Sequence, residues 1–227
     1  MHMHNMHMHK HSLQSAACLT AWLGAGGRSW HDSGGTIAGL HGAVVELKNK
    51  SLLAFGRGAD QPCAVDASLR CQAQSVSGTV GENWVVSASP FPAVHGGQRH
   101  VVLRLSEGPI LFLGFANGNE PCTKTVSDGC VVNVTSGSRF VFGLFAALTH
   151  DEGGSWAHYK LVSGVKAGTP PRPTNGSDDA LFYMSSTQGE PAGYVSAKQA
   201  ADGIIHVITS RNSYGFDLAW LMAKSIM

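Results

Sequence analysis

Short apolar runs alternate with short polar turns along most of the chain from residue 36 onward. Three pairs of runs have the form of a β-hairpin, and they cover residues 42–56, 100–115 and 193–210. A further apolar run occupies residues 139–148. Runs this short, punctuated by Gly, Ser and Asn, predict strands rather than helices. The second run of each pair is apolar enough to be covered on both faces.

The recurrence of these hairpins favours a β-propeller whose blades carry inserted loops, because inner blade strands are covered by neighbouring blades. A jelly roll or another β-sandwich is the alternative architecture. We therefore predict an all-β chain in which residues 36–227 form the folded domain. Residues 1–35 are expected to be a low-complexity Met/His tail, followed by a segment that could act as a poor signal peptide.

A turn motif at residues 149–156 supports this architecture. It fits Ser/Thr-x-Asp-x-Gly-x-Ser/Thr-Trp through Thr149, Asp151, Gly153, Ser155 and Trp156. The Asp carboxylate can accept hydrogen bonds from the backbone of its own turn, and the Gly can adopt a conformation that other residues avoid. The Trp ring can be buried between strands. We call this segment the intact box.

A second segment, residues 77–84, aligns with the first in the same register, and we call it the degenerate box. It keeps Ser77, Gly81 and Trp84, with Thr79 in place of the Asp and Asn83 in place of the second hydroxyl residue. Each box follows a strand-like run and precedes another, so each is expected on the hairpin between two outer strands of a blade. The motif predicts architecture and not chemistry.

With these two boxes, the chain resembles the sialidase-like family of Asp-box (BNR-repeat) propellers. The resemblance covers about residues 36 to 221, including stretches at 37–58, 87–99 and 201–221. It implies a six-bladed propeller with a funnel-shaped face that binds a glycan. It also implies a glycoside hydrolase that removes terminal sugars, sialic or otherwise acidic, from glycans.

The resemblance further implies the residues of the site. Sialidases hold the substrate carboxylate with three arginines, whose guanidinium groups match it in bidentate geometry. They use a Tyr nucleophile assisted by a Glu, together with an Asp acid/base. The positions that fit these roles are Tyr194 and Glu190 for catalysis, and Arg57, Arg99, Arg211 and His41 for substrate binding.

The sequence departs from the family near its beginning, where the Arg-Ile-Pro-type motif and the acid/base Asp have no counterpart. At roughly 40–50 residues per blade, the length from residue 36 allows about four blades of six. We therefore expect an incomplete, N-terminally truncated propeller, completed by a longer gene product or by partner chains. A non-catalytic glycan-binding propeller or an inactive fragment is the alternative to the hydrolase.

Composition mainly argues against certain classes of partner and against a membrane-spanning helix. The 16 basic and 15 acidic residues give a net charge of +1, so nothing predicts electrostatic capture of nucleic acid. No apolar run approaches the roughly 18–20 residues of a membrane-spanning helix. We expect a glycan partner, no cofactor and no metal site. Copper capture by the Met/His residues of the first eleven positions is an alternative to a low-complexity tail or a gene-model artefact.

Four cysteines occur in two matched pairs. Cys63 and Cys71 are eight residues apart, as are Cys122 and Cys130, and each pair encloses a polar interval after a Pro-Cys step. We predict two local disulfides, with four free thiols as the alternative. Disulfides favour an oxidising compartment. Together with the apolar segment at residues 15–25, they predict a secreted protein.

Overall fold

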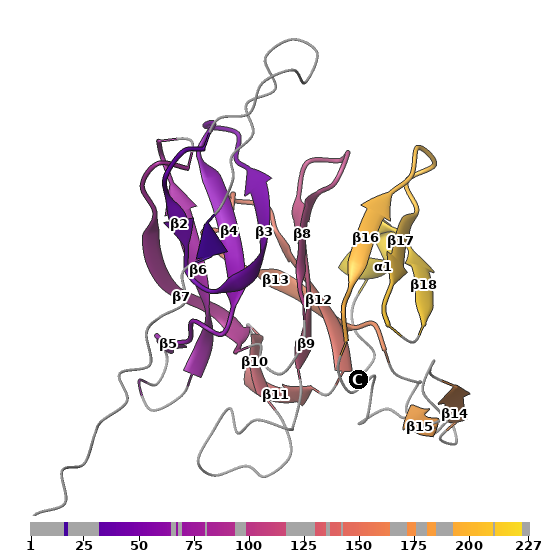
Figure 1. Cartoon of the computed structure of the whole chain (residues 1–227). Coiled ribbons are helices and arrows are strands. Elements are labelled where there is room, and N and C mark those ends of the chain that lie inside the picture. Colours follow the sequence, from indigo (N-terminus) through magenta and orange to yellow (C-terminus); the bar gives the residue numbers. More distant parts are fainter. Residues whose placement is uncertain are drawn as a thin grey trace, which may run out of the picture.

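The computed structural model describes residues 16–17, 32–64, 67, 70–79, 81–93, 99–116, 130–134, 137–141, 143–163, 172–175, 181–184, 193–210 and 212–223. These residues form antiparallel sheets and one short helix, which confirms the all-β prediction. Three sheets make up the body of the molecule and stand side by side (Figure 1). We call them the first, middle and third sheets.

Each of the three sheets runs up and down in chain order. The first sheet consists of β3 (Leu40–Glu46), β4 (Leu52–Arg57), β6 (Arg70–Ser77) and β7 (Val85–Pro92), with β5 (Gln61–Pro62) beside the start of β6. The middle sheet consists of β8 (Val101–Arg104), β9 (Ile110–Ala116), β12 (Gly143–Thr149) and β13 (Ala157–Leu161). The third consists of β16 (Ser196–Gln199), β17 (Ile205–Ile208) and β18 (Ser213–Phe216).

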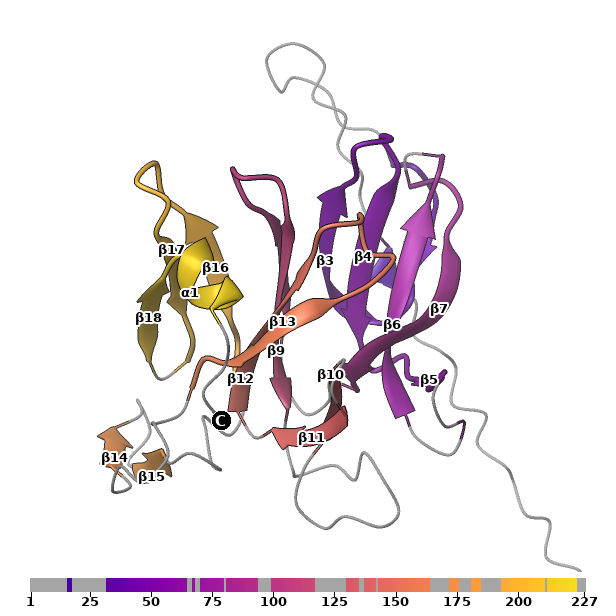
Figure 2. The same ribbon diagram turned by 180° about the vertical axis from the view of Figure 1, so that it is seen from behind.

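Three two-stranded ladders and one helix lie around this body. Three two-stranded ladders join β1 (Ala16–Ala17) to β2 (Thr36–Ile37), β10 (Cys130–Val134) to β11 (Gly137–Val141), and β14 (Arg172–Asn175) to β15 (Leu181–Met184). Helix α1 (Leu218–Met222) follows β18 and contacts β12 and β13. Figure 2 shows it in front of the strands of the third sheet, on the side that faces the viewer there. No helix among the described residues is long and apolar enough to cross a membrane.

The middle sheet is buried on both faces, which explains the strongly apolar runs of its two central strands. Residues such as Phe112 and Phe145 pack toward the first sheet, whereas their neighbours Leu113 and Leu144 pack toward the third. Successive side chains of a strand point to opposite faces, so apolar residues at every position require a neighbour on each side. The fold supplies both neighbours.

The first strands of the three sheets lie next to one another. Strand β3 contacts β8, and β8 contacts β16, as the row of strands in Figure 1 shows. All three predicted hairpins are present, as β3–β4, β8–β9 and β16–β17. The described residues hold three such sheets, where about four blades were expected. None of the described sheets closes into a barrel.

One predicted disulfide is present. Cys63 and Cys71 are bonded, and the bond closes the loop between β5 and β6. For the second pair, Cys122 lies outside the described residues and only the backbone of Cys130 is described. Most of the predicted tail at residues 1–35 also lies outside them.

Candidate functional site

Four of the predicted site residues gather at one end of the sheets, and we call them the arginine–tyrosine cluster. His41 lies near the start of β3, and Arg57 ends the neighbouring strand β4. Arg99 precedes β8, and Tyr194 precedes β16. Because the first strands of the three sheets are adjacent, side chains from three sheets meet here.

The contacts within the cluster centre on Arg99. Its Nη2 atom lies 3.2 Å from Nδ1 of His41. Its guanidinium carbon lies 4.4 Å from the centre of the Tyr194 ring, and the rings of His41 and Tyr194 are 6.1 Å apart. The backbone N–H of Arg99 also donates to the carbonyl of Gly193, so the segments leading into β8 and β16 are joined beneath the side chains.

The backbone around His41 is unusual and explains where its side chain lies. The ladder between β3 and β4 has a bulge between Leu40 and Ala43, and His41 has a φ of 51°. Bulges re-aim side chains, and a positive φ is uncommon for residues other than Gly. The chain passes β4 so closely here that a Cβ on Gly39 would lie 2.5 Å from the Arg57 carbonyl oxygen.

The permanently charged side chains of the cluster are its two arginines. Partial loss of hydration, followed by repulsion from Arg57 and Arg99, lowers the pKa of His41. A neutral imidazole can accept a hydrogen bond at one ring nitrogen, so Nδ1 of His41 is suited to accept the N–H of Arg99. Two guanidinium groups beside a neutral histidine and an aromatic ring form a site for an anion rather than for a cation.

His100 lies buried behind this cluster, a position that the sequence analysis did not single out. Its Nε2 lies 2.7 Å from the Phe55 carbonyl oxygen, and its ring stacks on Phe112. Burial lowers its pKa to about 4, with smaller contributions from Arg57 and His41. The signal available in the sequence was its place at the head of an apolar strand, where a buried imidazole needs a hydrogen-bond partner. Among the described residues, only Nε2 has one, and Nδ1 is buried without a partner.

Two other predicted site residues, Glu190 and Arg211, lie outside the described residues. The structure therefore brings together His41, Arg57, Arg99 and Tyr194 and leaves the predicted Glu partner of Tyr194 as a prediction. Among the described side chains, no group of three or more His, Cys, Asp or Glu could hold a metal ion.

The intact box lies at the other end of the sheets, between β12 and β13. The Asp151 carboxylate accepts hydrogen bonds from the backbone N–H and the hydroxyl of Ser155, at 2.8 and 2.6 Å, and from the Thr149 hydroxyl. Thr149 Oγ1 in turn accepts from the N–H of Gly153, whose φ is 92°. Asp151 therefore accepts a hydrogen bond from the backbone of its own turn, and Gly153 supplies the positive φ of that turn.

The degenerate box forms the corresponding turn between β6 and β7. Ser77 Oγ accepts from the N–H of Gly81, and Thr79 Oγ1 accepts from the N–H of Asn83, at 2.9 and 3.0 Å. Gly81 has a φ of 94°. Both boxes thus join the third and fourth strands of their sheets in chain order.

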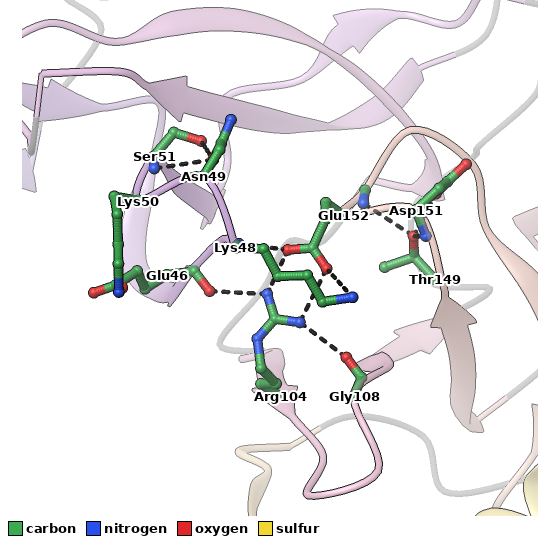
Figure 3. Close-up of polar contacts among 11 residues, drawn as sticks. Glu46, Lys48, Asn49, Lys50, Ser51, Arg104, Gly108, Thr149, Asp151 and Glu152 are labelled. Atoms are coloured by element: carbon green, nitrogen blue, oxygen red, sulfur yellow. Dashed lines mark hydrogen bonds and ion pairs between the residues drawn. The ribbon is translucent and has the colours of Figure 1, made fainter.

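The intact box also ties three hairpins together through Glu152 (Figure 3). Arg104, at the end of β8, donates to both carboxylate oxygens of Glu152 and to the Glu46 carbonyl. The backbone N–H of Lys48, in the β3–β4 turn, donates to the same carboxylate at 2.8 Å. The hydrogen bonds from Arg104, more than any other contact, lower the pKa of Glu152 to about 2. This contact joins the first and middle sheets, and the motif alone did not reveal it.

Comparison with models of known protein families found no match, and comparison with curated protein sequences found none either. One solved structure similar to this chain is a protein from Dyadobacter fermentans, described as being of unknown function. The two are 15% identical with a TM-score of 0.36, and the match covers 78% of this chain. The chain spans about half, 49%, of that protein's length.

Proposed function

We propose that the chain is part of a sialidase-type β-propeller that acts on glycans with a terminal acidic sugar. The arginine–tyrosine cluster would bind the carboxylate of that sugar. The convergence of Arg99, His41 and Tyr194 from three sheets carries this proposal. Residues far apart in the sequence build a positively charged site with an aromatic wall, which suits an anionic sugar.

The arrangement of the sheets supports the propeller part of the proposal. The first strands of the first, middle and third sheets are adjacent. Asp-box turns join the third and fourth strands of the first and middle sheets. The boxes and the cluster lie at opposite ends of β3, since the intact box reaches Glu46 and Lys48 whereas the cluster uses His41. Structural turns at one end leave the other end free for a ligand.

We propose hydrolysis as the activity, with Tyr194 as nucleophile and Glu190 as its partner. Tyr194 is 45% exposed, so its ring is accessible from solvent. A neutral Tyr nucleophile avoids bringing a carboxylate against an anionic substrate. Binding without catalysis is the second candidate, and it is favoured because the four members of the arginine–tyrosine cluster include no carboxylate that could serve as an acid or base. The Cys63–Cys71 bond supports a secretory-pathway location.

The test compares wild-type protein with Arg99→Ala and with Lys198→Ala, an exposed basic residue on β16 outside the cluster. Turnover of a fluorogenic sialoside and binding of a non-hydrolysable sialoside are measured for each. The proposal expects both in wild type and in Lys198→Ala, and at least a tenfold loss in Arg99→Ala, as expected for a charge-assisted contact. Binding without turnover would select the non-catalytic candidate. No binding by the wild type would overturn both.

A further inference from the structure

Arg99 differs from an ordinary surface arginine because two neighbours hold its guanidinium group. An exposed arginine normally samples many rotamers, and a ligand that binds it must stop that motion. Here the Tyr194 ring lies under the group at 4.4 Å, and Nδ1 of His41 lies 3.2 Å from Nη2. Among the described residues, His41 is the hydrogen-bond partner of this side chain, and its other N–H groups make no hydrogen bond to any of them.

Resting on the proposed function, we infer that Tyr194 and His41 are positioning residues for Arg99. The aromatic face of Tyr194 supports the guanidinium group, and the ring nitrogen of His41 sets its rotation. Arg99 thereby presents its remaining N–H groups to a planar carboxylate. In this role the ring of Tyr194 matters and its hydroxyl does not, which separates positioning from the nucleophilic role proposed above.

Hydrogen bonds hold the backbone at Tyr194 in place. Its backbone N–H donates to Oγ of Ser210, at 3.1 Å. The carbonyl of its neighbour Gly193 accepts a hydrogen bond from the backbone N–H of Arg99. The tyrosine and the arginine are therefore connected through the backbone as well as through the ring, which preserves their relative position before any ligand arrives. Cation–π contacts of this kind stabilise an arginine over an aromatic ring.

The surroundings of His41 are equally restrictive. The left-handed conformation of His41 within the bulge, and the close passage of Gly39 over the Arg57 carbonyl, fix the direction of its Cβ. Adding a Cβ to Gly56 would collide with the carbonyl oxygen of Ala38. Partial loss of hydration, and after it repulsion from the two arginines, lowers the pKa of His41 and so favours the neutral imidazole, which can accept a hydrogen bond from Arg99.

The test uses two pairs of substitutions. One pair distinguishes the ring of Tyr194 from its hydroxyl, and the other distinguishes the hydrogen-bond acceptor of His41 from its backbone conformation. Tyr194→Phe keeps the ring, whereas Tyr194→Ala removes it. His41→Asn keeps an acceptor and tolerates the positive φ, whereas His41→Ala removes the acceptor. Lys198→Ala serves as the control, and thermal unfolding of every variant checks that it is folded.

Binding of the non-hydrolysable sialoside is measured by titration of the full chain. We expect Tyr194→Phe and His41→Asn to bind within about twofold of wild type. Tyr194→Ala and His41→Ala should bind about tenfold more weakly, because Arg99 must then be ordered by the ligand. Equal losses in Tyr194→Phe and Tyr194→Ala, or none in either, would overturn the inference.

A measurement without ligand distinguishes this inference from the proposed function. The NMR shift of the Arg99 side-chain protons reports the ring current of Tyr194, whether or not a sugar binds. The inference expects a ring-current shift in wild type and in Tyr194→Phe that disappears in Tyr194→Ala. If the shift behaves so but no sialoside binds, positioning stands and the proposed function falls. If the shift is absent in wild type, positioning falls whatever the protein binds.

Discussion

The two Asp-box turns share a backbone but differ in what surrounds them. In the intact box, a carboxylate accepts three hydrogen bonds, while in the degenerate box the Thr79 hydroxyl accepts from one backbone N–H. In each box the hydroxyl oxygen at the first position accepts a hydrogen bond from the backbone N–H of a glycine with a positive φ. The turn therefore depends on that hydroxyl and glycine, and the carboxylate adds stability to a conformation already defined.

The tryptophans that end the boxes differ more strongly. Trp156 is 6% exposed and packs against Phe55, Phe91 and Phe112 between the first and middle sheets. Trp84 is only partly buried and donates its indole N–H to the Gly81 carbonyl at 3.0 Å. Among the described residues, Trp84 belongs to neither of the two hydrophobic clusters that pack between sheets. The same motif thus gives a core residue in the middle sheet and a half-buried residue in the first sheet.

The largest expected effect separates the two tryptophans. Trp156→Ala should lower the free energy of unfolding by about 3–5 kcal/mol, because it leaves a cavity among three Phe rings. Trp84→Ala should cost about 1 kcal/mol, the loss of a half-buried ring and one hydrogen bond. Urea unfolding of both variants measures the difference. Equal losses would show that Trp84 is as deeply packed as Trp156, and the comparison would fail.

Acid should weaken the intact box and leave the degenerate one unaffected. Hydrogen bonds from Ser155 lower the pKa of Asp151 from its ordinary 3.8 to about 2. A carboxyl group whose folded pKa is depressed stabilises the fold above its ordinary pKa, and that contribution is lost as pH falls toward 2. After allowance for solvent screening, we expect about 1 kcal/mol.

Urea unfolding of wild type and Asp151→Asn between pH 5 and pH 2 checks this expectation. The variant should be less stable at pH 5, and the gap should close as pH falls. Other titrating groups, such as His100 and Glu152, occur in both proteins and cancel in the difference. A gap independent of pH would mean that the Asp151 charge contributes nothing.

The smallest effect concerns repair of the degenerate box. Thr79→Asp should raise the free energy of unfolding by about 0.5–1 kcal/mol at pH 7, because a carboxylate accepts stronger hydrogen bonds than a hydroxyl. Thr79→Asn is the uncharged control and should change stability by less. Thermal unfolding of both variants at pH 7 and pH 3 measures this. A loss of stability in Thr79→Asp would show that the degenerate turn has diverged too far to use a carboxylate.

Much of the fold could be predicted because it depends on local chemistry. The three hairpins, both boxes and the Cys63–Cys71 bond follow from patterns within about 20 residues. Two features of the ends of the sheets could not be predicted in this way. The bridge of Glu152 to Arg104 and the burial of His100 join segments that are distant in the sequence, and no local pattern specifies such pairings.

The candidate site shows the same division. Its residue types were suggested by the family resemblance, and the sequence by itself determined that Arg57, Arg99, His41 and Tyr194 flank apolar strands. Only the tertiary structure decided that they meet, because their contacts require three sheets to stand side by side with their first strands adjacent. Periodicity and turn chemistry act over a few residues, so they determine strands and boxes. Packing of whole sheets acts across the chain, and it decides which strand ends share a surface and which tryptophan becomes part of the core.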